Sequence, residues 1–280
     1  MTDAIFSDIQ TSARNAYTEM ISRLTVVVAT GSIQDSCASG VLCRTLGGNP
    51  VILTARHVFD DRTSKAITIH NETIGSHEGE YEFHRGPKRN GEHQSEHKYI
   101  DVAVIVPSAH LARALEPHAG VVIADDSETQ ASDVVVLCGY PSYLASALDR
   151  HPDLKEINFG RIVYTTGVKG KDPVGRLMVN WSDAQNIVPP PDAPNFPPHG
   201  TDVFKLGRPH GISGGGLWRV RSTQKSSIWS PSESCQLIGI ASATRGELEF
   251  AEPVDLWSPW LVEVAKTINA ANLTNSVPTS

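Results

Sequence analysis

Cysteines are scarce in this sequence of 280 residues. Only four occur, Cys37, Cys43, Cys138 and Cys235, and no two of them form a CxxC pair. Four thiols spread over this length are too few for a disulfide framework. We therefore expect buried free thiols rather than a disulfide scaffold.

Long apolar runs and long basic runs are also missing. Apolar segments such as Val26–Ala29 fall far short of the roughly 18 residues that cross a bilayer. The first 20 residues are acidic early and lack the basic start and apolar stretch of a secretory signal. The net charge is -7, and no basic run is longer than Arg85–Arg89. These absences predict a cytoplasmic protein with neither a membrane nor a nucleic acid as partner.

What is present is the composition of a globular chain, with 40% hydrophobic and 20% charged residues. Apolar residues recur at helical spacing over residues 1–24 and again after Pro259, where a helix is expected to start. Between them, short Val- and Ile-rich runs broken by Gly, Asn, Asp and Pro are typical of a β-barrel or sandwich. We expect strands at Leu24–Ala29, Gly40–Thr45, Val51–Ala55, Ala66–His70, Val102–Val106, Val134–Gly139, Arg161–Val168, Leu177–Trp181, Gly216–Val220 and Leu237–Ala241.

An acidic, turn-prone stretch within residues 116–133 separates two groups of strands. We therefore expect an N-terminal amphipathic helix over residues 1–24, a first β-barrel over 25–124, and a second over 125–280 with the C-terminal helix. Two segments are expected to be loops. One is His70–Lys98, whose scattered histidines fit no metal-ligand spacing, and the other is the proline-rich Val188–His199.

The segment from Gly207 to Trp218 reads GRPHGISGGGLW and surrounds Ser213 with glycines. An acyl-transfer enzyme must aim two N–H groups at one developing oxyanion, which requires turn conformations that a β-carbon resists. Gly211 and Ser213 would supply these two donors. The alternative is an ordinary Gly/Ser turn between strands.

Two further segments carry residues suited to the same chemistry. His57 ends the apolar run VILTARHVF, at the point where the chain should leave the first barrel. Asp101 directly precedes the alternating run VAVIVP, and a poorly solvated carboxylate at such a place needs a partner. Taken alone, the histidine could be a surface or core residue, and the aspartate a turn residue.

Together these segments resemble the trypsin-like (chymotrypsin-fold) serine proteases, in motif and in the order His, Asp, Ser. TARHV is similar to the family's histidine segment, DVAVI to its aspartate segment, GISGG to its serine segment and LIGIAS to its cleft strand. The resemblance spans about residues 26–272. It implies an all-β fold of two six-stranded antiparallel Greek-key barrels with an N-terminal and a C-terminal helix, and the catalytic triad His57, Asp101 and Ser213.

The sequence departs from secreted members of the family at two positions. Ile212 stands where they carry an acidic residue that pairs with a processed N-terminus, and Val58 replaces a disulfide cysteine. Both departures resemble the intracellular or bacterial branch. Catalytic activity then has to be controlled by something other than N-terminal processing, either the N-terminal helix or an activating protein partner.

The resemblance also locates the substrate pocket. Its residues would be Gly207, Arg208 and His210 before the serine, and Ser242, Thr244 and Arg245 on and after the cleft strand. No acidic residue lies six positions before Ser213, so a preference for Lys or Arg is not supported. Thr244 would narrow the pocket mouth and the three basic groups would attract an acidic side chain, so a small or acidic residue is expected. The alternative is that the basic groups are solvated loop residues.

The predicted function is that of a serine endopeptidase that hydrolyses a protein or peptide substrate without cofactor or metal. Two alternatives stay open at this point. One is a non-catalytic module that keeps the protease fold as a binding or scaffold surface. The other is an esterase with the same triad, which only a comparison of substrates separates from a peptidase.

Overall fold

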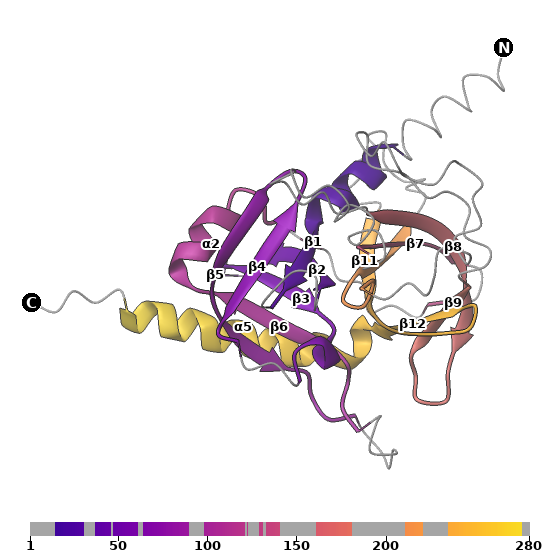
Figure 1. Ribbon diagram of the computed structural model, residues 1–280. Helices are drawn as coiled ribbons and strands as arrows, with labels where there is room; N and C mark the ends of the chain where they lie inside the picture. Colours follow the sequence, from indigo (N-terminus) through magenta and orange to yellow (C-terminus); the bar gives the residue numbers. More distant parts are fainter. Residues whose placement is uncertain are drawn as a thin grey trace, which may run out of the picture.

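The computed structural model shows two β-barrels packed side by side, with helices at their edges (Figure 1). The structure describes residues 15–30, 37–45, 47–60, 64–89, 98–120, 122, 129–130, 133–140, 161–180, 211–220 and 235–275. Of the predicted features, the Val188–His199 loop, Gly207, Arg208 and His210 lie outside the described residues. The predicted domain boundary at residues 124 and 125 also lies outside them and stays a prediction.

The first barrel closes in the strand order β1-β2-β3-β6-β5-β4, with every pairing antiparallel. Its interior is apolar, because the Val- and Ile-rich strands β1 and β3 are buried along their whole length. The strands are β1 (Thr25–Ala29), β2 (Cys37–Arg44), β3 (Pro50–Thr54), β4 (Ala66–Asn71), β5 (Gly75–Arg85) and β6 (Ala103–Pro107).

The second barrel closes in the order β10-β11-β12-β9-β8-β7, again antiparallel throughout. The strands are β7 (Val134–Gly139), β8 (Ile162–Lys171), β9 (Leu177–Asn180), β10 (Gly216–Val220), β11 (Cys235–Arg245) and β12 (Leu248–Pro253). The all-β fold of two six-stranded barrels with terminal helices is thus confirmed.

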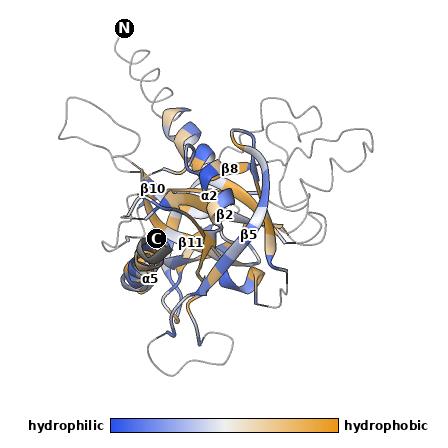
Figure 2. Cartoon of the chain, turned by 90° about the vertical axis from the view of Figure 1, so that its left-hand side faces the viewer, coloured by the Kyte–Doolittle hydropathy of each residue, from blue (hydrophilic) through white to orange (hydrophobic). Residues whose placement is uncertain are grey.

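Three elements escaped the sequence prediction. The first is β5, which forms much of the segment predicted as a loop at His70–Lys98 and is largely hydrophilic (Figure 2). The second is β12, in which both glutamates, Glu249 and Glu252, are buried. The third is the short helix α2 (Ala109–Leu115), which buries Leu111 and Leu115. In β5 and β12, polar residues mask the apolar periodicity on which the prediction rested.

Helices flank both barrels. Residues 15–24 are helical, as predicted for this part of the N-terminal segment. The C-terminal helix α5 (Val254–Asn275) begins at β12, five residues before Pro259, so Pro259 lies inside the helix rather than at its predicted start. It runs along the first barrel (Figure 1), where the Asn49 amide donates to Asn269 Oδ1 at 2.8 Å. In the described part of the chain, no helix is long and apolar enough to cross a membrane.

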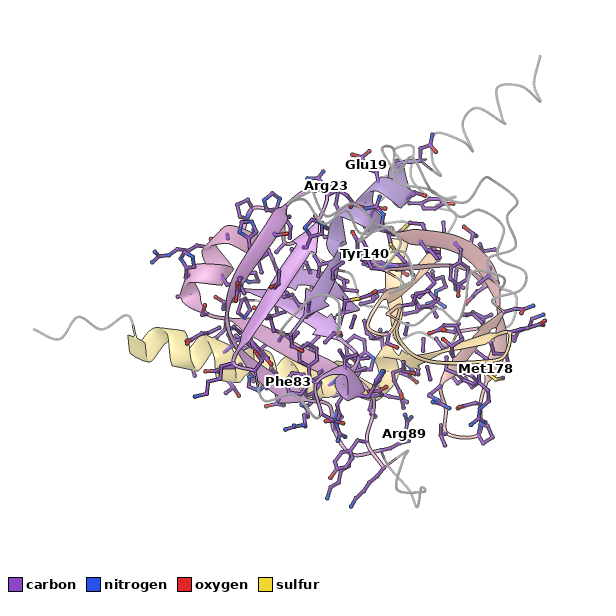
Figure 3. The ribbon with its side chains drawn as sticks, viewed as in Figure 1. Glu19, Arg23, Phe83, Arg89, Tyr140 and Met178 are labelled. Carbon is purple, nitrogen blue, oxygen red and sulfur yellow. The ribbon has the colours of Figure 1, made fainter. Side chains whose placement is uncertain are left out.

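The two barrels share buried contacts at their junction. One apolar cluster contains Val41 and Leu53 of the first barrel together with Trp218 and Leu237 of the second. Tyr140, which follows β7, lies between the barrels (Figure 3) and donates its hydroxyl to Glu72 Oε2 at 3.1 Å. The barrels therefore form one packed body in which residues of both can build a single site.

Candidate active site

His57 lies on a short turn that leaves the first barrel. The turn is a 3-10 helix, Arg56–Val58, reached from β3 through Ala55. Arg56 is held by Asp60 at 3.1 Å and by the ring of Tyr99, with its guanidinium carbon 4.2 Å from the ring centroid. The His57 ring is half exposed.

Asp101 approaches the same turn from the start of β6. Its neighbours Ile100 and Val102 are buried. Their backbones pair with the preceding loop, through Ile100 N–H to Pro87 O at 3.0 Å and Gly86 N–H to Val102 O at 2.7 Å. This pairing fixes the carboxylate, whose side chain is 25% exposed.

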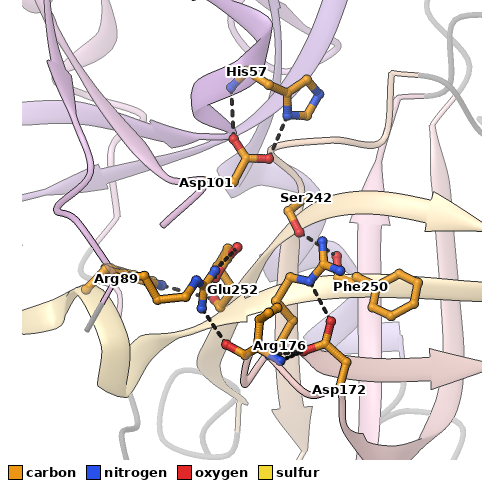
Figure 4. A network of polar contacts seen from close by, with 10 residues as sticks. His57, Arg89, Asp101, Asp172, Arg176, Ser242, Phe250 and Glu252 are labelled. Atoms are coloured by element: carbon orange, nitrogen blue, oxygen red, sulfur yellow. Dashed lines mark hydrogen bonds and ion pairs between the residues drawn. The ribbon is translucent and has the colours of Figure 1, made fainter. Parts of the chain in front are cut away.

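The Asp101 carboxylate contacts His57 at two points (Figure 4). Oδ1 accepts the His57 backbone N–H at 2.8 Å, and Oδ2 lies 2.7 Å from ring atom Nδ1. Because an ionised carboxylate only accepts, Nδ1 carries the proton and the neutral ring has its lone pair on Nε2. Burial lowers the pKa of His57, but the hydrogen bond and charge of Asp101 and the charge of Asp60 outweigh it, so the pKa is raised.

Ser213 lies on a turn between two glycines with positive φ, Gly211 at 95° and Gly214 at 90°. In the described part of the chain, neither Gly211 N–H nor Ser213 N–H has a hydrogen-bond acceptor. Two backbone donors on the turn of Ser213 thus have no acceptor among the described residues, which is the arrangement that an oxyanion site requires. The described residues show no hydrogen bond between the Ser213 hydroxyl and His57, a contact that is often long without substrate.

The serine turn belongs to the second barrel but docks onto the first. Ser39 N–H of β2 donates to Ser213 O at 2.9 Å, and Ser39 Oγ donates to Gly211 O at 2.7 Å. A Cβ on Gly214 would lie 2.0 Å from Ser39 O and 3.0 Å from Ala55 N. Because Ala55 leads directly into the His57 turn, this close approach brings the serine turn up to the histidine.

Ser39 was missed by the sequence prediction. It is fully buried in β2, and its hydroxyl also accepts the Tyr140 N–H at 2.8 Å. Nothing in the local pattern CASG marks this serine, because its partners lie 101 and 172 residues away in the chain.

A buried ion pair supports Asp101 from the opposite side (Figure 4). Arg89 contacts both carboxylate oxygens of Glu252 on β12 at 2.6 and 2.7 Å, and the two side chains are 4% and 2% exposed. The Glu252 carboxylate also accepts the backbone N–H of Asp101. Burial raises the pKa of Glu252 in spite of the Arg89 charge. The pair thus joins the aspartate segment to the second barrel.

The part of the predicted pocket that the structure describes lies at the end of β11. Ser242 is buried and donates to Phe250 O at 3.2 Å, while Thr244 and Arg245 are exposed. The Thr244 hydroxyl donates to the carboxylate of Glu249, a buried residue of β12 that the sequence prediction did not include. Within the described ranges, no three His, Cys, Asp or Glu side chains are arranged to hold a metal ion.

Comparisons with known proteins bear on the fold. No protein-family model matches the sequence, and no curated protein matches it significantly. The structure is similar to a serine endoprotease from Yersinia pestis, with a TM-score of 0.50 and 17% identity over 90% of this chain and 65% of that one. It is also similar to human heparin binding protein, with a TM-score of 0.52 and 10% identity over 92% and 94%.

The chain therefore has the trypsin-like serine protease fold. It spans 65% of the length of the Yersinia endoprotease. At identities of 10% and 17% the likeness establishes the fold alone, and function has to be argued from the site.

Proposed function

We propose that this protein is a serine endopeptidase with His57, Asp101 and Ser213 as its catalytic triad. The observation that carries the proposal is the pairing of Asp101 with His57 Nδ1 at 2.7 Å, next to a serine turn with two N–H donors that have no acceptor among the described residues. This combination provides an oriented base, a nucleophile and an oxyanion site, which together suffice for acyl transfer.

The proposed reaction runs in two halves. His57 Nε2 takes the Ser213 proton as the hydroxyl attacks the peptide carbonyl, and the developing oxyanion is held by the N–H groups of Gly211 and Ser213. His57 then gives its proton to the leaving amine, which leaves an acyl-enzyme that water hydrolyses by the same steps. Asp101 keeps Nδ1 protonated and stabilises the imidazolium as it forms.

A cytoplasmic location and an activating protein partner remain part of the proposal. All four cysteines are free thiols, and three of them are buried. Burial raises the pKa of Cys43 and Cys235 to about 12 and that of Cys138 to about 11. These thiols therefore stay protonated and unreactive while the chain is folded, which suits a reducing compartment.

The test is labelling of the purified protein with a fluorophosphonate probe, followed by mass spectrometry of the modified peptide. We expect the label on Ser213 in the wild type and none in Ser213→Ala. Absence of label in the wild type would instead favour either a latent enzyme that awaits its partner or a non-catalytic binding module. The fold accommodates such a module, because one similar structure is named for binding heparin rather than for proteolysis.

A further inference from the structure

The N-terminal helix, residues 15–24, is fastened by its last turn to the junction of the barrels. Ile21 is fully buried in the apolar cluster that both barrels share, and its carbonyl oxygen accepts the Thr25 hydroxyl at 2.8 Å. The buried Asn71 side chain donates through Nδ2 to Arg23 O and to Thr25 O, both at 3.1 Å. The carbonyl groups at the end of a helix need such partners, so these contacts fix where the helix ends.

Glu72 follows Asn71 directly and contacts the second barrel. Its Oε2 accepts hydrogen bonds from the Tyr140 hydroxyl at 3.1 Å and from Arg161 Nη1 at 2.7 Å. The same Tyr140 hydroxyl lies 3.5 Å from Thr25 O, directly after the end of the helix. Burial and the charge of Glu72 raise the pKa of Tyr140 well above 10, so the hydroxyl stays protonated and acts as a donor. Tyr140 lies between the two barrels, on the side where the N-terminal helix joins them (Figure 3).

The backbone of Tyr140 lies against the serine turn. Its N–H donates to Ser39 Oγ at 2.8 Å, and Ser39 Oγ donates to Gly211 O at 2.7 Å. The preceding residue, Gly139, ends β7 so close to the turn that a Cβ on it would lie 3.2 Å from Ile212 Cα. The end of β7 therefore forms part of the surface on which the serine turn rests.

On this basis, and resting on the proposed function, we infer that Tyr140 is a positioning residue that couples the N-terminal helix to the oxyanion donors. Its side chain is hydrogen-bonded to Glu72 at the end of the helix, whereas its backbone holds Ser39 and, through Ser39, the carbonyl group of Gly211. A shift of the helix end therefore moves Tyr140, and Ser39 then no longer fixes the peptide groups around Ser213. Control of activity by the N-terminal helix, as expected from the sequence, acts by this route.

The first experiment removes only the Tyr140 hydroxyl. Tyr140→Phe keeps the ring and the backbone N–H, but it breaks the hydrogen bond to Glu72. We expect the rate of fluorophosphonate labelling at Ser213 to fall about fivefold, which corresponds to the net effect of one hydrogen bond. With a peptide substrate, kcat should fall by a similar factor and KM should change little. Tyr81→Phe is the matched control, because it removes an exposed hydrogen bond to Ser64 O and should leave the labelling rate unchanged.

A double-mutant cycle tests whether the helix acts through this hydroxyl. Thr25→Val keeps the branched shape of the side chain but removes the hydrogen bond to Ile21 O that fastens the helix end. In the wild-type background it should slow labelling by about twofold to fivefold. In the Tyr140→Phe background it should have no further effect, because the link to the serine turn is already broken. Independent losses that multiply in the double variant would overturn the coupling between the helix and the turn.

A second readout, amide hydrogen exchange, does not depend on activity. The N–H groups of Gly214 and Gly215 donate to backbone oxygens at 2.7 and 2.8 Å, so their exchange reports the opening of the serine turn. The exchange is measured in the full chain, by mass spectrometry of the peptide that contains the turn. We expect it to be about fivefold faster in Tyr140→Phe than in Tyr81→Phe.

The outcomes separate this inference from the proposed function. Unchanged labelling and unchanged exchange in Tyr140→Phe overturn the inference and leave the peptidase standing. Faster exchange in a protein that fluorophosphonate does not label keeps the coupling between Tyr140 and the turn and removes the peptidase. If the Tyr140→Phe protein fails to fold, Glu72→Ala removes the same hydrogen bond from a side chain that is 35% exposed and decides in its place.

Discussion

Among individual residues, Asp101 determines the protonation of His57. The pKa of His57 is raised because the hydrogen bond and charge of Asp101, with the charge of Asp60, outweigh the opposing effect of burial. Only the neutral ring can accept the Ser213 proton. We therefore expect the acid limb of the pH profile of kcat/KM to have its midpoint above the ordinary histidine value of about 6.5.

Replacing Asp101 with Asn tests this assignment directly. An amide beside Nδ1 no longer fixes the productive tautomer, so kcat should fall by about 10⁴-fold. Asp60→Asn is the matched control, since Asp60 affects the pKa of His57 only through its charge, and the amide oxygen of Asn can still accept from Arg56. It should move the acid limb to lower pH and leave kcat nearly unchanged. A similar loss in both variants would mean that Asp101 has only an electrostatic role.

Glu249 makes stability depend on pH in a direction opposite to that of most carboxylates. Its pKa is raised to about 8 in the folded chain, whereas in the unfolded chain it titrates near 4.3. Between these values only the folded state holds the proton, so stability falls as the pH rises. From pH 5 to 8 the loss should be on the order of a few kcal/mol. Urea unfolding of the wild type and Glu249→Gln should show this slope only in the wild type.

Among elements, the turn of residues 211–215 depends on its contact with β2. Ser39 Oγ links Gly211 O to Tyr140 N–H, so Ser39→Ala leaves both groups without this partner. We expect a loss of about 1–3 kcal/mol in stability. We also expect a lower kcat with little change in KM, because the oxyanion donors lose their support. Ser39→Cys and Ser39→Thr should also be less stable and less active than the wild type, since Ser39 is fully buried and a larger side chain has no room there.

Gly214 provides a second test of the same contact. Alanine at this position would have to adopt φ near 90° and place its Cβ 2.0 Å from Ser39 O. Gly214→Ala should therefore displace the serine turn and abolish fluorophosphonate labelling. Gly48→Ala is the control, because Gly48 also has positive φ, at 84°, but a Cβ there meets nothing within 4 Å. It should cost some stability and leave labelling intact.

The success of sequence reasoning differs between elements for a physical reason. Strands such as β7 and β10 were predicted with their exact bounds, because their residues are mostly apolar and bounded by turn residues. The strand β5 was missed because GSHEGEYEFHR has no buried residue along its length. Pro259 was taken as a helix start, yet α5 begins at Val254 and Trp257 is fully buried inside it.

The same contrast holds in the candidate site. His57, Asp101 and Ser213 were found because each has a characteristic local segment. Glu249 and Glu252 were not, because charged residues in a strand predict exposure, and their burial depends on β-barrel closure. Arg89 lies 163 residues from its partner Glu252, so no local pattern could connect the two.

For the whole molecule, the buried pair of Arg89 and Glu252 links the two barrels next to Asp101. Arg89 follows β5 of the first barrel and also donates to Val174 O in the second, at 2.8 Å. Replacing Arg89 with Met leaves the Glu252 carboxylate buried without its partner. Such a loss typically costs about 3–5 kcal/mol, even where the intact pair adds little net stability.

Unfolding in urea, followed by the fluorescence of the buried Trp218 and Trp257, measures this cost. Arg89→Met should destabilise strongly, whereas Lys266→Met, which breaks the exposed pair with Glu263, should change stability by at most about 0.5 kcal/mol. The double variant Arg89→Met with Glu252→Leu removes both charges and should recover much of the loss. If it recovered stability but not kcat, the pair would be needed to position Asp101, whose N–H the Glu252 carboxylate accepts. Full recovery of both stability and kcat would instead mean that the pair only links the two barrels and does not position Asp101.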